Sequence, residues 1–182
     1  RLRPKTLNEY IGQKHLVGEG AILRQMIEND NLSSFILWGP PGVGKTTLAR
    51  IIAHQLERPF YTLSAVTSGV KEVREVIDKA KRFAAVSSGL FGLPEAGSRT
   101  SSSGDRRAIL FIDEIHRFSK SQQDSLLGAV EDGTITLIGA TTENPSFEVI
   151  TPLLSRCQVY VLKSLEKADL LELLHRVLTT DE

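Results

Sequence analysis

The chain reads FILWGPPGVGKTT from Phe35 to Thr47. An apolar run typical of a strand leads into a turn rich in glycine and proline, and a helical pattern follows over residues 48–56. Residues 39–46 match the pattern G-x-x-x-x-G-K-[ST] in the strand–loop–helix context that this motif requires. An accidental Gly-Pro turn is the alternative, but every fixed position is filled and both flanking elements are present. The stretch therefore predicts a loop that binds the phosphates of a nucleoside triphosphate.

Each residue type in this loop has a chemical reason. Glycines let backbone N–H groups approach phosphate oxygens closely. The following helix offers its unpaired N-terminal donors and the positive end of its dipole to the same anion. Lys45 is expected to reach the β- and γ-phosphates, and the Thr46 hydroxyl to ligate Mg²⁺. The residues of the loop predicted to bind the nucleotide are Gly39, Pro40, Pro41, Gly42, Val43, Gly44, Lys45, Thr46 and Thr47.

Composition sets limits on the class of protein. A chain of 182 residues can bury a core, and one domain of roughly 150 residues plus a remnant is expected. Lys and Arg number 22, as do Asp and Glu, so the zero net charge argues against a polybasic nucleic-acid binder but leaves room for a local basic patch. Cys157 is the single cysteine, which excludes a disulfide framework and favours a reducing, intracellular compartment. No apolar run approaches the ~18 residues that span a membrane. The chain opens without methionine and stops soon after a helical pattern begins, so we expect a fragment of something longer.

Hydrophobic patterns alternate between strand and helix along the chain. Strands are expected at residues 35–38, 60–64, 108–112, 134–142 and 158–162. Helices are expected at 21–29, 48–56, 70–84, 119–130 and 167–178, with a helical turn at 150–154 and a capping box of Ser119 and Gln122 at the start of 119–130. Residues 1–18 look like an irregular lead-in, and residues 87–107, rich in glycine and serine, like a flexible surface insertion. This alternation predicts a parallel, doubly wound α/β sheet with its site at the carboxyl ends of the strands.

A second chemical cluster follows the apolar run at residues 108–112, where Asp113 and Glu114 stand side by side. We expect this strand to lie next to the strand before the phosphate-binding loop. Asp113 could then hold the Mg²⁺ shell, and Glu114 could polarise a water for in-line attack on the γ-phosphate. Surface carboxylates are common, so the pair is informative only because the loop precedes it.

Polar residues after the next strand and one later arginine complete the candidates. Thr142 and Asn144 could orient the attacking water or touch the γ-phosphate, although an Asn-Pro pair also favours a plain turn. Taken alone, Arg156 is as well explained by a surface ion pair. On the helix expected at residues 70–84, Lys71 and Arg74 could meet a nucleic-acid backbone, but a solvated face is the simpler explanation.

Four motifs in order resemble an AAA+ ATPase module of the P-loop NTPase class. They are GPPGVGKT at 39–46, FIDEIH at 111–116, GATT at 139–142 and LSRC at 154–157. The Ser-Arg-Cys triplet resembles the one found in the clamp-loader clade of these ATPases. Residues 113–124 and 131–147 resemble the RarA/MgsA family, which includes the eukaryotic Werner-helicase-interacting ATPase. The insertion and the triplet suggest a eukaryotic or fungal member.

The resemblance implies roles for particular residues. Ile11, Gly12 and Val17 would line the adenine pocket, since residues 3–4 and 10–13 look like the family's nucleotide-contacting box. Thr142 would take the sensor-1 position, with Asn144 as the alternative. Arg156 would be an arginine finger that serves the ATP of a neighbouring subunit. Residues 1–163 would form the ATPase core, a five-stranded parallel sheet flanked by helices, and residues 164–182 the start of a truncated helical lid.

The resemblance also implies a function: ATP hydrolysis with Mg²⁺, coupled to DNA at replication forks or single-strand/duplex junctions, in a homo-oligomer that meets replication and repair proteins. The setting would be the nucleus in a eukaryote. Without the rest of the lid, this chain is expected to bind nucleotide weakly, to be largely monomeric and to turn over slowly. A clamp-loader subunit, a branch-migration motor and an ATP-binding assembly switch remain alternatives. Lys71, Arg74, Arg117 and Lys120 are the candidate DNA contacts.

Overall fold

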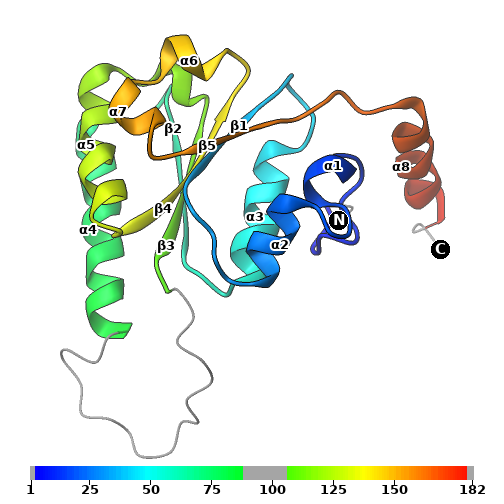
Figure 1. The fold of residues 1–182 in the computed structure, drawn as a ribbon, viewed down its shortest axis with the longest axis horizontal. Coiled ribbons are helices and arrows are strands. Elements are labelled where there is room, and N and C mark those ends of the chain that lie inside the picture. Colours follow the sequence, from blue (N-terminus) through cyan, green and yellow to red (C-terminus); the bar gives the residue numbers. More distant parts are fainter. Residues whose placement is uncertain (1–2, 88–105, 180–182) are drawn as a thin grey trace, which may run out of the picture.

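The computed structural model describes residues 3–87 and 106–179, and Figure 1 shows them as a sheet with helices on both faces. Most of the predicted insertion at 87–107 lies outside the described residues. The strands are β1 (Phe35–Trp38), β2 (Phe60–Ser64), β3 (Ala108–Asp113), β4 (Ile135–Thr141) and β5 (Gln158–Val161). The helices are α1 (Lys14–Val17), α2 (Ile22–Glu28), α3 (Lys45–Gln55), α4 (Val70–Ser87), α5 (Lys120–Glu131), α6 (Pro145–Glu148), α7 (Thr151–Leu154) and α8 (Lys167–Thr179), with a 3-10 turn, η1 (Ile115–Arg117).

The five strands form one parallel sheet in the order β2-β3-β4-β1-β5, which confirms the predicted fold class. The expectation that β3 lies next to β1 was wrong, because β4 is inserted between them. A crossover connection can skip a position in a parallel sheet, so the order along the chain does not fix the order in space. All five strands still end at the same edge, where Trp38 pairs with Thr141 and Ser64 with Asp113.

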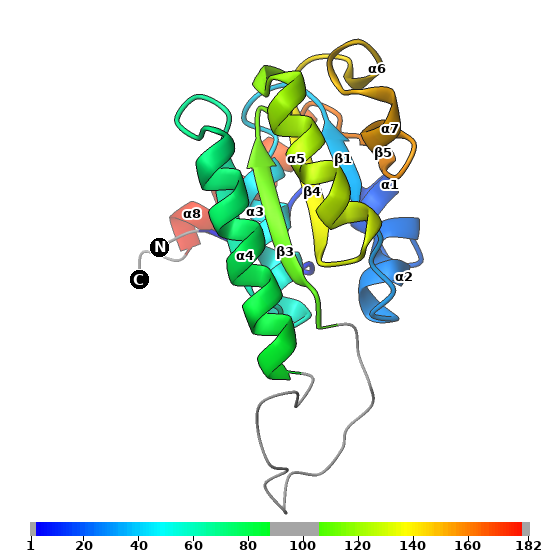
Figure 2. The same cartoon turned by 90° about the vertical axis from the view of Figure 1, so that its left-hand side faces the viewer.

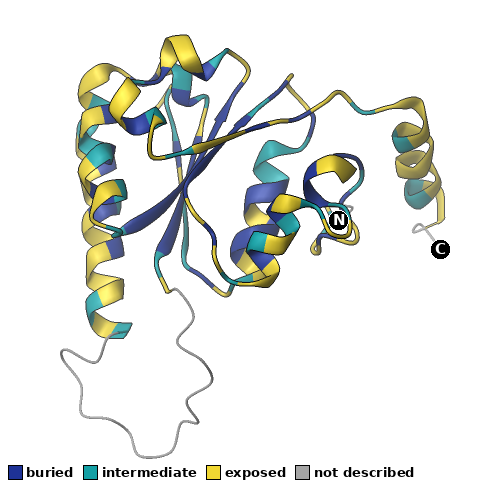
Figure 3. Ribbon diagram, viewed as in Figure 1, coloured by how far each residue is buried: buried dark blue, intermediate teal, exposed yellow. Residues whose placement is uncertain are grey.

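Two hydrophobic layers cover the sheet because successive side chains of a strand point to opposite faces. On β1, Phe35 and Leu37 pack with the layer that contains α2 and α3, while Ile36 packs with the layer that contains α4 and α5. Figure 2 shows α4 and α5 lying across the face of the sheet opposite α3. Burial follows the same plan in Figure 3, where the three central strands β1, β3 and β4 are mostly dark blue and α8 is mostly yellow. The core therefore holds the strand ends in fixed relative positions.

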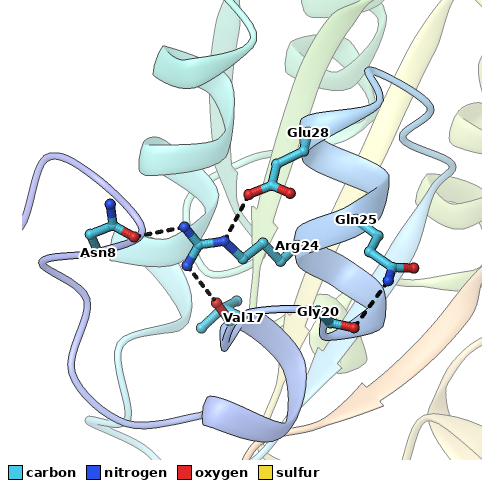
Figure 4. A network of polar contacts seen from close by, with 6 residues as sticks. All are labelled: Asn8, Val17, Gly20, Arg24, Gln25 and Glu28. Carbon is cyan, nitrogen blue, oxygen red and sulfur yellow. Dashed lines mark hydrogen bonds and ion pairs between the residues drawn. The ribbon is translucent and has the colours of Figure 1, made fainter.

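The N-terminal lead-in is more ordered than its composition suggests. Arg24 on α2 donates to Asn8 Oδ1 at 2.7 Å and to the Val17 carbonyl at 3.3 Å, and it pairs with Glu28 at 2.8 Å (Figure 4). The buried Gln13 side chain exchanges two hydrogen bonds with the backbone of Lys163, at 2.6 and 2.9 Å. These contacts attach the lead-in to the body of the domain and to the segment between β5 and α8.

The predicted elements agree with the structure to within a few residues, with three omissions, of which the 3-10 turn η1 is one. The short helices α1 and α6 were predicted as irregular lead-in and loop, because four residues are too few to display a helical period. The predicted capping box at Ser119 and Gln122 is present at the start of α5. Among the described residues, none of the helices has the length and apolar character needed to cross a membrane.

Candidate functional site

The loop between β1 and α3 has the backbone that phosphate binding requires. Gly42 and Gly44 have φ angles of 78° and 96°, a region that side chains other than hydrogen disfavour. Gly39 lies so close to β5 that an added Cβ would stand 2.8 Å from the Leu162 carbonyl oxygen. Helix α3 begins at Lys45, so its unpaired N–H groups face the loop. The predicted phosphate-binding turn is thus formed by backbone conformation and by close packing.

Lys45 is held inside the loop by the loop's own carbonyl groups. Its Nζ donates to the carbonyls of Gly39 and Pro40, both at 2.8 Å. Partial burial lowers the pKa of this ammonium, and the carboxylates of Asp113 and Glu114 oppose that effect. The lysine therefore lies within electrostatic range of the two acidic side chains.

The predicted phosphate-handling residues meet in one cavity of about 520 Å³ at the carboxyl edge of the sheet. We call it the phosphate cavity; its lining residues are Arg3, Pro41, Gly42, Gly44, Lys45, Thr46, Thr47, Arg50, Asp113, Glu114, Thr141 and Thr142. Asp113 is the last residue of β3, and the loop follows β1, so β4 separates their strands at this edge. The cavity thus brings together cations, carboxylates and hydroxyls from three strand ends.

Glu114 has an unusual backbone and a charged neighbour. Its φ of 51° puts a residue other than glycine in the left-handed region, a strain that is found at functional turns. Its N–H donates to Asp113 Oδ1 at 3.0 Å, and its carboxylate pairs with Arg117 Nε at 3.2 Å. Both side chains of this ion pair are substantially exposed, so water can compete for the carboxylate.

Two neighbouring threonines at the end of β4 have different environments. Thr141 is buried and its hydroxyl bonds His116 Nδ1 and the backbone of Glu143 at about 3 Å, which fixes the turn. Thr142 is exposed and lines the phosphate cavity. Asn144 does not line it; its Oδ1 accepts the Ser146 N–H at 3.0 Å and caps α6. The structure therefore places Thr142, rather than Asn144, beside Asp113 and Glu114.

A second cavity of about 600 Å³ adjoins the loop on the side of the lead-in. This base cavity is lined by Arg3, Pro4, Lys5, Glu9, Tyr10, Ile11, Gly42, Val43, Gly44, Thr47, Leu165, Leu173, Arg176 and Val177. Of the three residues predicted to line an adenine pocket, Ile11 is present. Gly12 and Val17 are buried behind the wall, and a Cβ on Gly12 would meet Leu165 at 2.7 Å. Helix α8 supplies the opposite wall, and Arg176 Nη1 donates to the Glu9 carbonyl.

Arg156 lies at the other edge of the sheet. Gln158, two residues later, donates its N–H to the Ser34 carbonyl, at the level where β1 begins. The loop begins where β1 ends, opposite Leu162, so about six residues of extended chain, roughly 20 Å, separate Arg156 from it. Arg156 instead pairs with Glu131 Oε1 at 2.9 Å, with both side chains partly exposed. It cannot serve the phosphate cavity of its own chain.

Several residues that border the cavities were not predicted individually as site residues, although Tyr10 falls in the segment 10–13 that resembles the nucleotide-contacting box. Arg50 lines the phosphate cavity, and its position four residues after Thr46 on α3 could have indicated this. Tyr10 lies against the loop, and His116 supports the end of β4. Nothing in the local sequence signals these two contacts, since each joins residues 25 or more positions apart.

Curated proteins and solved structures similar to this chain agree with the geometry. Replication-associated recombination protein A of Escherichia coli K12 is 52% identical over 174 residues, covering 96% of this chain and 35% of that protein. The same-named protein of Haemophilus influenzae is 50% identical over 176 residues, again covering 35% of its length. ATPase WRNIP1 of Dictyostelium discoideum is 47% identical over 178 residues, covering 98% of this chain and 18% of that protein. The chain thus spans about a third of the length of the bacterial relatives.

The structure of the Holliday junction branch migration motor RuvB of Thermotoga maritima superposes with a TM-score of 0.71 at 30% identity. The match covers 98% of this chain and 54% of RuvB. The Escherichia and Haemophilus proteins are 52% and 50% identical to the chain and the Dictyostelium protein is 47% identical, so the expected eukaryotic or fungal origin is not supported. The model of the AAA family, "ATPase family associated with various cellular activities", matches residues 35–165. Because this match covers more than half of the 182 residues, the chain belongs to the AAA family of ATPases.

Proposed function

We propose that the chain binds ATP with Mg²⁺ and hydrolyses the nucleotide to ADP and phosphate. The observation that carries the proposal is the phosphate cavity, which Lys45, Asp113 and Glu114 line from two separate elements. Phosphoryl transfer needs positioning and charge neutralisation more than covalent chemistry. A lysine, two carboxylates, hydroxyls and the N-terminus of α3 supply both. Membership in the AAA family supports the same reaction.

Thr46 and Asp113 are the residues that would hold Mg²⁺, since both border the phosphate cavity. Across the described residues there is no group of three or more His, Cys, Asp or Glu that could hold a metal. Mg²⁺ suits this sparse set, because it keeps several waters and takes one or two protein oxygens together with substrate phosphates. When bound, it would neutralise charge on the phosphate oxygens.

Glu114 is the residue proposed to polarise the attacking water. It stands one residue beyond Asp113 in the same cavity, where its carboxylate could accept a hydrogen bond from a water close to the proposed metal ligand. Its exposed ion pair with Arg117 is worth little and can be exchanged for a water molecule. Lys45 would leave the carbonyls of Gly39 and Pro40 for the β- and γ-phosphates. Thr142 would orient the water or contact the γ-phosphate, and Asn144 remains the second candidate.

Arg156 is proposed to act on the nucleotide of a neighbouring chain in a homo-oligomer. The separation of about 20 Å along β5 prevents it from reaching its own phosphate cavity. Half of its side chain is exposed at the surface, where another chain could approach. An arginine supplied in trans would make turnover depend on assembly.

DNA at replication forks or junctions is the proposed target. Support comes from the 50–52% identity to replication-associated recombination proteins and from RuvB, a branch migration motor. The DNA contacts remain candidates: Lys71 pairs with Glu75, and Arg117 with Glu114, which leaves both partly neutralised. Branch migration is the second candidate activity, favoured by the RuvB likeness, and an assembly switch without DNA-coupled turnover is the third. Replication and repair proteins are proposed as further partners.

The test is ATP turnover by the complete natural protein, with and without forked DNA, for the wild type and for Glu114→Gln. Turnover that rises with DNA and disappears in Glu114→Gln, with ATP binding retained, is the expected result. Glu143→Gln is the matched control, because it changes a nearby carboxylate that does not line the cavity. Unchanged turnover in Glu114→Gln would remove this residue from the mechanism. Turnover indifferent to DNA would favour the assembly switch.

A further inference from the structure

We propose that Tyr10 is a positioning residue whose hydroxyl holds the phosphate-binding loop in its anion-accepting shape. The inference rests on the proposed nucleotide site and concerns a residue outside the phosphate-binding motif at residues 39–46. The Tyr10 hydroxyl donates to the Val43 carbonyl at 3.1 Å and shares its hydrogen with the Gly44 carbonyl at 3.3 Å. A side chain 33 residues away in sequence thus holds the two peptide groups that precede Lys45.

The hydrogen bonds from the Tyr10 hydroxyl to these carbonyls also determine where the N–H groups of the same peptides point. In a trans peptide the C=O and the N–H point in opposite directions. With the carbonyls of Val43 and Gly44 directed at Tyr10, the N–H groups of Gly44 and Lys45 are directed away from it, toward the phosphate side of the loop. Those N–H groups are donors that a phosphate-binding loop uses. The Gly44 carbonyl also accepts the Leu48 N–H at 2.9 Å, so the helix helps to orient the Lys45 N–H. The hydroxyl's own contribution is therefore chiefly to the Val43 carbonyl and the Gly44 N–H, and it leaves the anion position empty.

Tyr10 fits closely beneath the loop. A Cβ added to Gly44 would lie 2.9 Å from the hydroxyl oxygen and 3.2 Å from the ring. No side chain caps α3, since its N-cap is Gly44 itself. Besides Tyr10, the side chain of Lys45 also stabilises the loop, because its Nζ donates to the carbonyls of Gly39 and Pro40. Because phosphate would draw Lys45 away from those carbonyls, Tyr10 is the hold that persists when nucleotide is bound.

The hydroxyl stays a donor throughout the working range of pH. Burial raises the pKa of Tyr10 to about 12, so the group remains protonated at neutral and moderately alkaline pH. Tyr10 also lines the base cavity. One residue therefore borders the space proposed for the base and also contacts the loop through its hydroxyl, and removing the hydroxyl alone separates the two contributions.

The experiment compares the wild type, Tyr10→Phe and Tyr160→Phe in their binding of Mg·ATP and of adenosine by calorimetry. Tyr10→Phe keeps the ring and removes the hydroxyl. We expect it to weaken ATP binding about three- to tenfold, the effect of one neutral hydrogen bond, and to leave adenosine binding unchanged. Tyr160→Phe is the matched control, since it removes a hydroxyl that donates to the Met26 sulfur at 3.3 Å, outside both cavities. It should change neither affinity.

Two outcomes would overturn the inference: Tyr10→Phe binding ATP as tightly as the wild type, or losing ATP and adenosine affinity by the same factor. The second would mean that the substitution disturbs the base cavity rather than the loop. Urea unfolding of each variant shows whether the fold is retained, and Tyr10→Ala, which removes the ring too, should weaken both ligands. A wild type that binds no ATP would instead overturn the proposed function, and the inference with it.

Discussion

Replacing Arg156 with alanine separates an effect on stability from an effect on turnover. In the structure Arg156 contacts Glu131 at 2.9 Å, with 50% and 40% of the two side chains exposed. Exposed pairs of this kind contribute about 0.2–1 kcal/mol, so Arg156→Ala should lower the free energy of unfolding by less than about 1 kcal/mol. An arginine that stabilises the transition state of a neighbour's γ-phosphate is worth roughly 10³- to 10⁵-fold in rate. A large loss of turnover with almost unchanged stability and ATP binding is the expected pattern.

Three measurements on the complete natural protein test that expectation: urea unfolding, ATP binding and steady-state turnover. Glu131→Gln is the control, because it breaks the same ion pair and keeps the arginine. Mixing Arg156→Ala chains with Lys45→Ala chains should restore part of the activity, since one chain then supplies an intact loop and the other an intact arginine. A role of Arg156 in trans is refuted if Arg156→Ala hydrolyses ATP at the wild-type rate, or if Glu131→Gln loses as much activity as Arg156→Ala.

The remaining predictions concern packing, capping and titration. Gly39→Ala should destabilise the domain by about 1–3 kcal/mol in urea unfolding, because its Cβ would meet the Leu162 backbone at 2.8 Å; a wild-type midpoint would show that β5 can move away. Ser119→Ala should cost about 0.5–2 kcal/mol by removing the cap of α5, with ATP affinity unchanged as the check that the effect is confined to that helix. Burial raises the pKa of Cys157 to about 12 from 9.0. The unfolded chain therefore loses this proton first, and the thiol's contribution to stability, present below pH 9, falls as pH rises from 9 toward 12. At pH 8, iodoacetamide should alkylate the folded chain at least about tenfold more slowly than the urea-unfolded chain, and equal rates would contradict the burial.

Local patterns predicted the parts of the fold that depend on neighbouring residues. Continuous apolar runs predicted parallel strands such as β3, and the Ser119 capping box marked the start of α5. The position of β4 between β1 and β3 was not predictable in this way, since it depends on which strand packs best beside Ile36 and Leu110 once the helices are in place.

In the candidate site, too, local motifs were predictable and contacts between distant residues were not. Lys45, Asp113 and Glu114 belong to contiguous motifs and were predicted from their spacing, and the structure brings them to one cavity. Contacts between distant segments were not predictable: the Tyr10 hydroxyl on the loop crosses 33 residues, and the Thr141–His116 bond crosses 25. Such contacts depend on three-dimensional packing, which a single sequence does not display.

Helix α8 has no buried residue, yet it forms one wall of the base cavity. Its polar attachments include the Arg176 bond to the Glu9 carbonyl, and the segment just before the helix is held by the bonds between Gln13 and Lys163. A helix with so little apolar anchorage is expected to open at far lower free energy than the sheet, and its amides should exchange with deuterium early. A base bound between α8 and Tyr10 would add contacts only while the helix is docked. Binding of a nucleotide would then favour the docked position of α8, and docking of α8 would favour nucleotide binding. The fraction of chains with α8 docked would therefore depend on whether nucleotide is bound.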